Sequence, residues 1–286
     1  MKTADKWVDY ELLDATDGER LERWGDIILI RPDPQVIWRS GRKSPLWERA
    51  HARYIRSSKG GGAWEMYKKV SEVWSISYGK LKFNLKPMGF KHTGLFPEQA
   101  VNWDMYTELL SAMNGAKVLN LFAYTGGATL ACLSAGAAVT HVDASKGMVA
   151  WASDNAASSG LKSAPVRWIV DDCVKFVQRE IRRGNSYDGI IMDPPSYGRG
   201  PGGEVWKLED KIYDLISDAV KLLKDKSFLV INSYTAGLSP AVMDYMLNET
   251  AAASKGGCCE SYELGLRVTE SGCSLPCGAT SVWCNI

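Results

Sequence analysis

Two prolines follow an acidic residue in the run Asp193-Pro194-Pro195-Ser196-Tyr197, and this arrangement could orient a substrate amine. Proline restricts the backbone, so the pair fixes the directions of the Asp193 carboxylate and the Pro194 carbonyl. Two acceptors held in this way can bind both hydrogens of an exocyclic base amine, which directs the nitrogen lone pair toward an electrophile. Tyr197 could stack on such a base. A rigid turn that closes a strand is the alternative interpretation.

A second candidate site begins where an apolar run ends in a small, glycine-bearing turn, Ala123-Tyr124-Thr125-Gly126-Gly127. Glycine lets the backbone approach a ligand closely, and the start of the following helix offers free N–H groups. Further along the chain, the apolar run 138–143 ends in Asp143. An acid at the end of the second strand of a doubly wound sheet binds ribose hydroxyls. The two features together predict a site for a nucleoside-containing cofactor.

The composition of the turn distinguishes between such cofactors. A dinucleotide requires the spacing G-x-G-x-x-G, because the backbone must approach a pyrophosphate. The turn over residues 123–128 lacks that spacing. S-adenosyl-L-methionine carries no phosphate and requires less glycine, so the sequence favours this methyl donor over NAD.

These segments resemble class I S-adenosylmethionine-dependent methyltransferases, and more narrowly the bacterial family that includes the large-subunit ribosomal RNA cytosine methyltransferases. The resemblance extends over residues 86–235 and is weak before them. The matching segments are His92-Thr93-Gly94-Leu95-Phe96-Pro97-Glu98-Gln99, Leu119-Asn120-Leu121-Phe122-Ala123-Tyr124-Thr125-Gly126-Gly127, Val142-Asp143-Ala144-Ser145-Lys146, Val170-Asp171-Asp172 and Met192-Asp193-Pro194-Pro195-Ser196-Tyr197.

The resemblance implies roles for individual residues around the donor. Asp172 would bind the adenine amino group, and Cys173 would place a backbone N–H near the adenine ring, whereas Asp171 could simply cap the next helix. Lys146 would lie near the ribose, unless it is an ordinary solvated charge. Gln99, with Phe96, would close the pocket from the other side. The implied donor contacts are Gln99, Phe122, Ala123, Tyr124, Thr125, Gly126, Gly127, Asp143, Ala144, Lys146, Asp172, Cys173 and Asp193.

The sequence departs from the cytosine-C5 members of this family. Methylation at C5 requires a cysteine thiolate to attack C6 first, and those relatives carry that cysteine after the fifth core strand. The corresponding segment here, residues 230–238, contains none. We therefore expect N-methylation, with Asp193, Pro194 and Tyr197 at the site of transfer and Asn232 lining the base pocket. Cys277 has no assigned role.

A strongly basic segment precedes the resembling region. Residues 31–91 hold 14 Lys and Arg against 4 Asp and Glu, a difference of +10 in a chain whose net charge is +1. Aromatic residues alternate with these cations, a composition that suits RNA because phosphates bind the charges and bases stack on the rings. A small β-rich domain with a Trp core is the alternative. The predicted RNA contacts are Arg42, Lys43, Arg53 and Arg56, and the loop 57–62 could become ordered on a partner.

Periodicity indicates the elements that position these residues. From residue 117, strands over 117–122, 138–143, 166–170, 187–192 and 227–233 alternate with helices over 126–135, 146–159, 172–183 and 207–224, which predicts a parallel sheet. Another helix over 240–254 and strands over 260–268 and 279–286 close the chain. We predict an α/β fold, a Rossmann-like seven-stranded class I methyltransferase sheet over 87–286, with a small β-rich N-terminal domain over 1–86 that binds RNA.

Composition narrows the functional class. No apolar run is long enough to span a membrane and the N-terminus lacks a signal core, so we expect a cytoplasmic protein. The cysteines and three histidines show no zinc spacing, and no metal is predicted. The resulting hypothesis is a methyltransferase that acts on RNA, with ribosomal RNA as the favoured substrate. A methyltransferase for a small molecule or a protein side chain and a non-catalytic RNA-binding protein with this fold are the alternatives. No oligomeric state is predicted.

Overall fold

The computed structural model describes residues 1–57, 61–199, 202–235 and 237–286. Part of the loop 57–62 therefore lies outside the described residues. The chain forms two compact units, of which the first comprises residues 1–101 and 264–277 and the second residues 102–263 and 278–286. The expected N-terminal domain over 1–86 falls within the first unit, which extends further, and a domain boundary at residue 86 stays a prediction.

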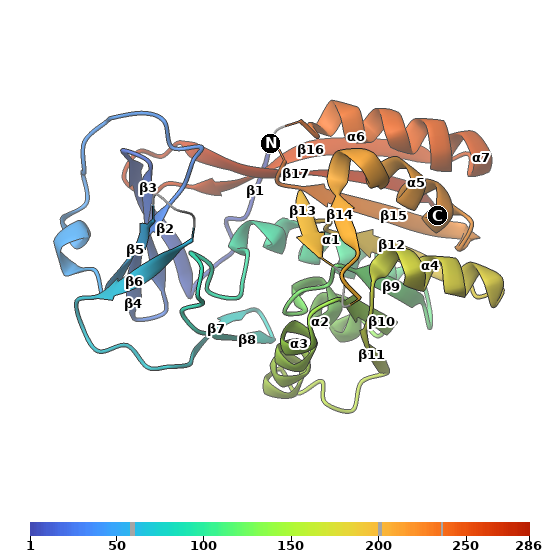
Figure 1. Ribbon diagram of the computed structural model, residues 1–286, viewed down its shortest axis with the longest axis horizontal. Coiled ribbons are helices and arrows are strands. Elements are labelled where there is room, and N and C mark those ends of the chain that lie inside the picture. Colours follow the sequence, from blue (N-terminus) through green and yellow to red (C-terminus); the bar gives the residue numbers. More distant parts are fainter. Residues whose placement is uncertain (58–60, 200–201, 236) are drawn as a thin grey trace. The chain divides into compact units, whose positions relative to one another are not determined.

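A large sheet with the order β1-β16-β17-β15-β12-β9-β10-β11 forms the framework of the α/β fold (Figure 1). Parallel pairing joins β9 to β10 and β12, β10 to β11, and β12 to β15, whereas β17 runs antiparallel to β15. The strands are β9 (Lys117–Leu121), β10 (Ala138–Asp143), β11 (Val166–Val170), β12 (Tyr187–Met192), β15 (Leu223–Ser233), β16 (Cys258–Arg267) and β17 (Ser274–Asn285). These seven strands confirm the predicted class I sheet, and β1 (Lys2–Thr3) adds an eighth strand beside β16.

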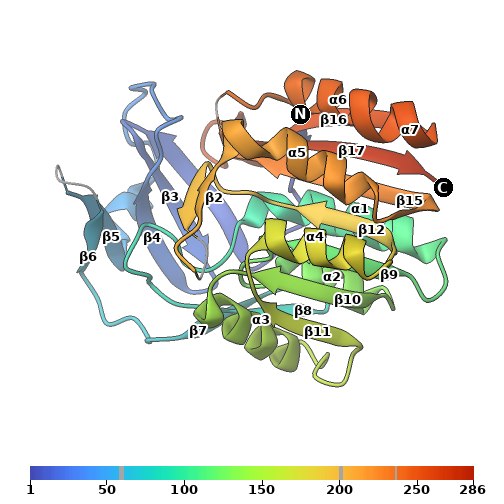
Figure 2. The same cartoon turned by 45° about the vertical axis from the view of Figure 1, so that its right-hand side comes forward.

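Helices cover both faces of this sheet (Figure 2). Helices α4, α5 and α6 bury their apolar side chains against Leu121, Met192 and Ile231 on one face. On the opposite face, α1 and α2 make polar contacts with strand residues, among them Asn102 with Asn232 and Thr129 with Asn120. The helices are α1 (Ala100–Ser111), α2 (Gly127–Ser134), α3 (Lys146–Ser158), α4 (Cys173–Arg182), α5 (Leu208–Val220), α6 (Pro240–Leu247), the π-helix η3 (Asn248–Ala252) and α7 (Ala253–Lys255).

The first unit is rich in strands, as expected. Its five-stranded sheet has the order β2-β3-β4-β5-β6, and β7 pairs with β8. The turn between β2 and β3 has left-handed φ angles of 54° at Asp17 and 79° at Gly18. The bounds are β2 (Tyr10–Thr16), β3 (Glu19–Trp24), β4 (Ile27–Pro32), η1 (Pro45–Arg49), β5 (Ala52–Arg56), β6 (Gly62–Met66), β7 (Trp74–Tyr78), β8 (Leu81–Leu85) and η2 (Pro97–Gln99).

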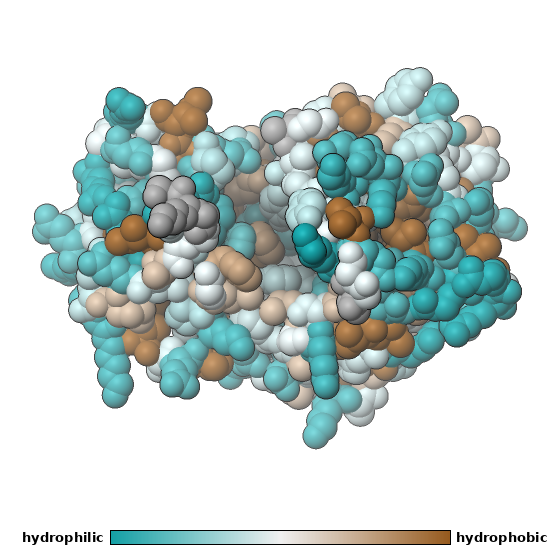
Figure 3. Space-filling view, viewed as in Figure 1, coloured by the Kyte–Doolittle hydropathy of each residue, from teal (hydrophilic) through white to brown (hydrophobic). Residues whose placement is uncertain are grey.

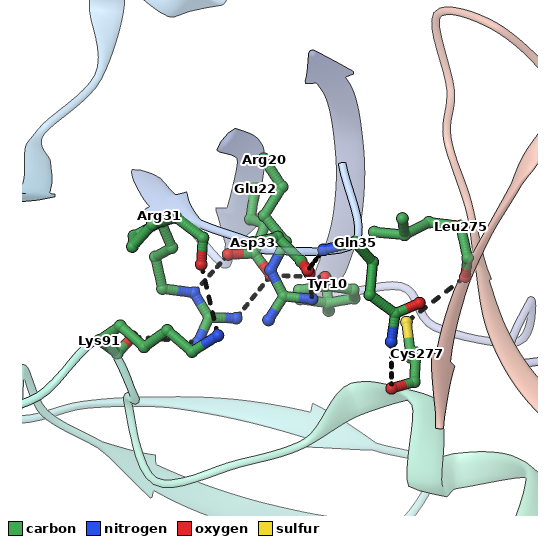
Figure 4. Close-up of polar contacts among 10 residues, drawn as sticks. Tyr10, Arg20, Glu22, Arg31, Asp33, Gln35, Lys91, Leu275 and Cys277 are labelled. Carbon is green, nitrogen blue, oxygen red and sulfur yellow. Dashed lines mark hydrogen bonds and ion pairs between the residues drawn. The ribbon is translucent and has the colours of Figure 1, made fainter. Parts of the chain in front are cut away.

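A buried group of charges lies on this five-stranded sheet (Figure 4). Glu22 accepts hydrogen bonds from Arg31 over 2.5 and 2.6 Å and from the Tyr10 hydroxyl over 2.8 Å. Arg20 lies 3.4 Å from Glu22 and 3.5 Å from Asp33. The two guanidinium groups hold the Glu22 carboxylate ionised despite its burial, so its pKa falls to about 2.

The surface in Figure 3 is mainly hydrophilic, with hydrophobic side chains scattered over it. Within the described ranges, no helix is long and apolar enough to cross a membrane.

Candidate active site

Four residues lie together at the carboxyl edge of the sheet. Val142, Leu121, Met192 and Ile231 are paired in one row across β10, β9, β12 and β15. The residues that follow them in the chain are Asp143, Phe122, Asp193 and Asn232. In parallel α/β sheets, ligands bind beyond this edge of the strands. The register therefore brings predicted donor and substrate residues to one end of the second unit.

The turn after β9 has an unusual backbone. Phe122 and Tyr124 have φ angles of 53° and 50°, and Gly126 has a φ of 89°. Non-glycine residues adopt this left-handed region at a cost of about 1–2 kcal/mol, and such strain is often found at ligand sites. Asn155 of α3 supports the turn by donating to the Thr125 carbonyl over 2.9 Å. The turn is thus held in a strained shape by the structure around it.

The two glycines of the turn are required for packing. A Cβ on Gly126 would lie 2.9 Å from the Ala152 Cβ of α3, and a Cβ on Gly127 would lie 2.8 Å from Cζ2 of Trp103. The first glycine lets α3 approach, and the second accommodates the indole of α1. Their small size therefore has a structural reason besides the access for a ligand that the sequence suggested.

Asp143 connects two neighbouring loops of the site. Its Oδ2 accepts the backbone N–H of Tyr124 over 2.8 Å, and its Oδ1 accepts that of Ser145 over 2.8 Å. Burial raises the pKa of this carboxyl, and the two N–H groups oppose that effect. Each carboxylate oxygen can accept more than one hydrogen bond, so the same group can still bind a ribose diol. Ala144 belongs to the loop after β10, and the exposed Lys146 begins α3.

The loop after β11 corrects one expectation. Asp172, and not Asp171, caps α4, because its Oδ1 accepts the N–H of Lys175 over 2.9 Å. Asp171 accepts the Asp172 N–H over 2.9 Å and pairs with Arg179, so its side chain braces the loop. The reason is geometric: only the residue that directly precedes the helix reaches its orphan N–H groups. Capping by Asp172 is compatible with a bond from Oδ2 to an adenine amine.

The thiol of Cys173 has a structural partner. Its sulfur accepts the N–H of Phe122 over 3.3 Å and lies 3.8 Å from the carbonyl oxygen of Val142. Burial raises the pKa of this thiol. Cys173 therefore joins the start of α4 to the turn after β9 as a neutral group.

The Asp193-Pro194-Pro195 loop is tied back to this turn by Trp206. The Trp206 Nε1 donates to the Pro195 carbonyl over 2.6 Å, and its ring lies 5.0 Å from that of Phe122. Trp206 belongs to β14 (Val205–Lys207), which pairs with β13 (Tyr197–Arg199). Tyr197 begins this hairpin and is 55% exposed. Sequence reasoning missed Trp206, for which a tryptophan shortly after the double proline was the available signal.

Asn232, predicted to line the base pocket, lies in a buried polar network. Its Oδ1 accepts from Asn102 Nδ2 over 3.0 Å and from Thr280 Oγ1 over 2.8 Å. Asn102 also donates to Thr280 over 2.9 Å and accepts from the Tyr262 hydroxyl over 2.8 Å. The carboxamide oxygen of Asn232 therefore faces Asn102 and Thr280.

The remaining predicted residues belong to the first unit. Gln99 ends η2, and its predicted contact with the donor stays a prediction, as does that of Phe96. Arg42 and Arg53 both pair with Glu19, over 3.1 and 2.7 Å. Part of the predicted phosphate-binding charge is thus neutralised within the protein.

Other basic and aromatic side chains of this unit divide between the surface and the core. Lys43 and Arg56 are exposed, and of the aromatic residues Trp47 and Tyr54 are buried whereas Tyr67 is exposed. Arg42 stacks over Trp47 at 4.5 Å. Within the described parts of the chain, no group of three or more acidic, His or Cys side chains could hold a metal ion.

The arrangement of these residues agrees with the protein family and the solved structures to which the chain is similar. The family model for S-adenosylmethionine-dependent methyltransferases covers residues 36–256. The chain belongs to this family. A solved structure of such a methyltransferase from Agrobacterium tumefaciens is 36% identical with a TM-score of 0.94, over 99% of this chain and 92% of that one. A structure of SMU.776 complexed with SAH, at 19% identity and a TM-score of 0.73, covers 98% of this chain and 76% of its own, and shows the same fold.

Curated relatives of this methyltransferase carry the name ribosomal RNA large subunit methyltransferase K/L. The protein from Shewanella baltica is 28% identical over 242 residues, and that from Shewanella frigidimarina is 31% identical over the same length. Both alignments cover 80% of the methyltransferase chain but only 32% of the relative. The chain thus spans about a third of the length of these relatives.

Family membership confirms the predicted enzyme class and the methyl donor S-adenosyl-L-methionine. The residues present suit this donor. The carboxylates of Asp143 and Asp172 lie at the ends of neighbouring strands, and the aromatic rings of Phe122 and Tyr124 suit a sulfonium. Bound there, the donor would supply an electrophilic methyl group.

Proposed function

We propose that this methyltransferase transfers a methyl group to an exocyclic nitrogen of a base in ribosomal RNA. The placement of Asp193 carries the proposal: this residue leaves the sheet directly beside Phe122, in the same row as Asp143. A substrate amine bound by Asp193 would therefore meet the donor end-on. The names of the curated relatives support ribosomal RNA as the acceptor, and a cytoplasmic location would follow from that substrate.

In this proposal residues at the carboxyl ends of β9, β10 and β11 would hold the donor. Asp143 accepts hydrogen bonds from the ribose hydroxyls, with Lys146 nearby, and Asp172 binds the adenine amine beside the Cys173 N–H. The backbone of Ala123, Thr125, Gly126, Gly127 and Ala144 would surround the cofactor, and Phe122 and Tyr124 would flank its methionine part. Aromatic faces favour the positive sulfur.

The transfer step requires positioning more than covalent chemistry. Asp193 and the Pro194 carbonyl would accept the two amine hydrogens, while Tyr197 stacks on the flipped base. The exposed ring of Tyr197 is suited to that contact. The amine nitrogen forms a bond to the methyl carbon as the carbon–sulfur bond breaks, and the nitrogen then releases a proton.

The thiols support attack by nitrogen rather than at cytosine C5. A C5 mechanism needs a thiolate nucleophile, and residues 230–238 contain no cysteine. Burial raises the pKa values of Cys132 and Cys173, which keeps both thiols protonated at neutral pH. The pKa of Cys277 is raised in the same way.

Basic side chains of the first unit would bind the RNA backbone. Arg56 and Lys43 are exposed, and Arg42 and Arg53 share the Glu19 carboxylate, for which phosphates would compete. Binding of this kind weakens as salt rises.

A deletion strain tests the proposal. In nucleoside mass spectrometry, the ribosomal RNA of this strain should lack one N-methylated base. That base should return when the wild-type gene is supplied and should stay absent when an Asp193→Asn gene is supplied. An unchanged set of methylated nucleosides would contradict the proposal.

A further inference from the structure

Two cysteines that the proposed mechanism does not use lie at adjacent ends of β16 and β17. These strands are neighbours in the large sheet (Figure 1). The short turn 268–273 joins them, so they run antiparallel. Cys258 begins β16, and Cys284 is the last residue but one of β17. Both thiols are free.

Two contacts between the strands fix their register. The hydroxyl oxygens of Ser261 and Ser281 lie 2.5 Å apart. A Cβ on Gly257, which directly precedes β16, would lie 3.0 Å from the Cβ of Asn285. Counting along the antiparallel strands from the first pair leads to the second, so both contacts give the same register.

This register places Cys258 directly opposite Cys284. Opposed residues of an antiparallel pair have Cα atoms about 4.5–5.5 Å apart. A disulfide spans that separation, because it joins Cα atoms about 4.4–6.8 Å apart. The Cys258 thiol already contacts its neighbour, since it donates to the Cys284 carbonyl over 3.9 Å.

The two side chains also lie on the same face of the sheet. Cys259 and Trp283 pack on the apolar core that α4, α5 and α6 cover. Successive side chains of a strand point to opposite faces. Cys258 and Cys284 are adjacent to these two residues, and therefore both lie on the opposite face.

The two thiols differ in their access to solvent. Cys258 is exposed and Cys284 is half-buried. Burial raises the pKa of the Cys284 thiol. A small oxidant therefore meets Cys258 first, and Cys284 is placed to react with the product.

We propose that Cys258 and Cys284 form a dithiol site that hydrogen peroxide oxidises to a reversible disulfide, which fastens β17 to β16. The site is independent of the acceptor of the methyl group. The disulfide would close a loop that comprises the turn and most of both strands.

The oxidation proceeds in two steps. The Cys258 thiolate attacks the peroxide, a sulfur–oxygen bond forms as the oxygen–oxygen bond breaks, and the leaving oxygen takes up a proton to become water. The Cys284 thiol then attacks the sulfenic acid, the disulfide bond forms, and the sulfur–oxygen bond breaks to release a second water. The thiols lose two electrons to the peroxide. Thiols such as glutathione reverse the bond by exchange.

Peptide mapping tests the site. Reduced protein, freed of reductant, is treated with hydrogen peroxide, alkylated with N-ethylmaleimide and digested with trypsin. Cleavage after Lys255 and Arg267 places the two cysteines in separate peptides, 256–267 and 268–286. We expect fragmentation spectra to show these peptides joined through Cys258 and Cys284, and dithiothreitol to separate them. Oxidised protein should melt several degrees higher than reduced protein, because the cross-link restricts the unfolded chain.

Single substitutions supply the controls. Cys258→Ser and Cys284→Ser should each abolish the link and the rise in melting temperature. Cys259→Ser, on the other face, and Cys273→Ser, which removes another exposed thiol, should keep both. Peroxide-treated wild type without this link, a link that persists in Cys258→Ser, or an oxidised protein that melts no higher than the reduced one would overturn the assignment.

Discussion

The Tyr124 backbone N–H donates to Oδ2 of Asp143 over 2.8 Å. This bond joins the turn after β9 to the end of β10, so the residue proposed to bind the ribose also stabilises the strained turn beside the methionine part. Donor affinity and local order should therefore depend on the same carboxylate.

Asp143→Asn should weaken donor binding about 10–100-fold, because charge-assisted hydrogen bonds contribute roughly 1.5–3 kcal/mol. Calorimetric titration with SAH measures the loss. Asp154→Asn removes an exposed acid from the neighbouring helix α3 and serves as the control, with unchanged affinity expected. Equal affinity in Asp143→Asn and wild type would exclude the proposed role.

Gly126→Ala should destabilise the second unit more than Gly160→Ala. Both glycines have left-handed backbones, with φ of 89° and 74°, but only at Gly126 would the new Cβ meet another atom closely, Ala152 Cβ at 2.9 Å. Backbone strain predicts a loss of about 1–2 kcal/mol at either site, and overpacking adds about 1–3 kcal/mol at Gly126. Urea unfolding gives both values, and equal losses would argue against the close packing of α3 on the turn.

Trp206→Phe should lower methyl transfer several-fold and leave SAH binding intact. The variant keeps a ring near Phe122 but loses the 2.6 Å bond from Nε1 to the Pro195 carbonyl. The Asp193 loop would then be less well fixed, and positioning errors reduce the rate. Trp206→Leu removes the ring as well, and should lower both transfer and SAH affinity. A Trp206→Phe enzyme with wild-type turnover would show that this bond is dispensable.

Glu22→Ala should destabilise the protein by about 3–5 kcal/mol, because it leaves the guanidinium groups of Arg20 and Arg31 buried without their carboxylate. Glu11→Ala is the matched control: Glu11 pairs with Arg23 over 3.1 Å at a partly exposed position. That loss should not exceed about 1 kcal/mol. Chemical denaturation measures both losses of stability. Similar losses would show that the buried ion pair of Glu22 contributes no more to stability than the partly exposed pair of Glu11.

The same pair predicts a dependence of stability on pH. The Glu22 pKa is about 2 in the folded protein against 4.5 ordinarily, so folding favours the ionised form. The associated stability is complete above pH 4.5 and is lost as pH falls from 4.5 toward 2. Glu22→Gln should flatten the unfolding free energy over this window. An unaltered pH profile would contradict the assignment.

The sheet was largely predictable because its strands are local apolar runs. The strands over 138–143, 166–170 and 187–192 have the predicted bounds. Contacts between distant segments were not predictable in the same way. The strand β1 pairs with β16 across most of the chain, and Trp206 contacts Phe122 through a hairpin that periodicity does not indicate.

In the candidate site too, local features were predictable from the sequence and contacts between distant segments were not. The motif at the end of each strand indicated Asp143 and Asp193, since Asp143 ends β10 and Asp193 directly follows β12 in sequence. Which of two adjacent acids caps α4 depends on local backbone geometry, and the burial of Asn232 depends on its partners Asn102 and Thr280. Hydrogen bonds between distant elements have no signature in a single sequence.

Single-turnover methyl transfer by wild type and Asp193→Asn tests the central claim most directly. Unmethylated large-subunit ribosomal RNA and labelled S-adenosylmethionine are the substrates, and SAH titration confirms that both proteins bind the donor. We predict that wild type labels one exocyclic nitrogen and that Asp193→Asn transfers at least about a hundredfold more slowly, because it loses an acceptor that positions the amine. A wild-type enzyme that binds SAH but labels no ribosomal RNA, or an Asp193→Asn enzyme with wild-type turnover, would contradict the account.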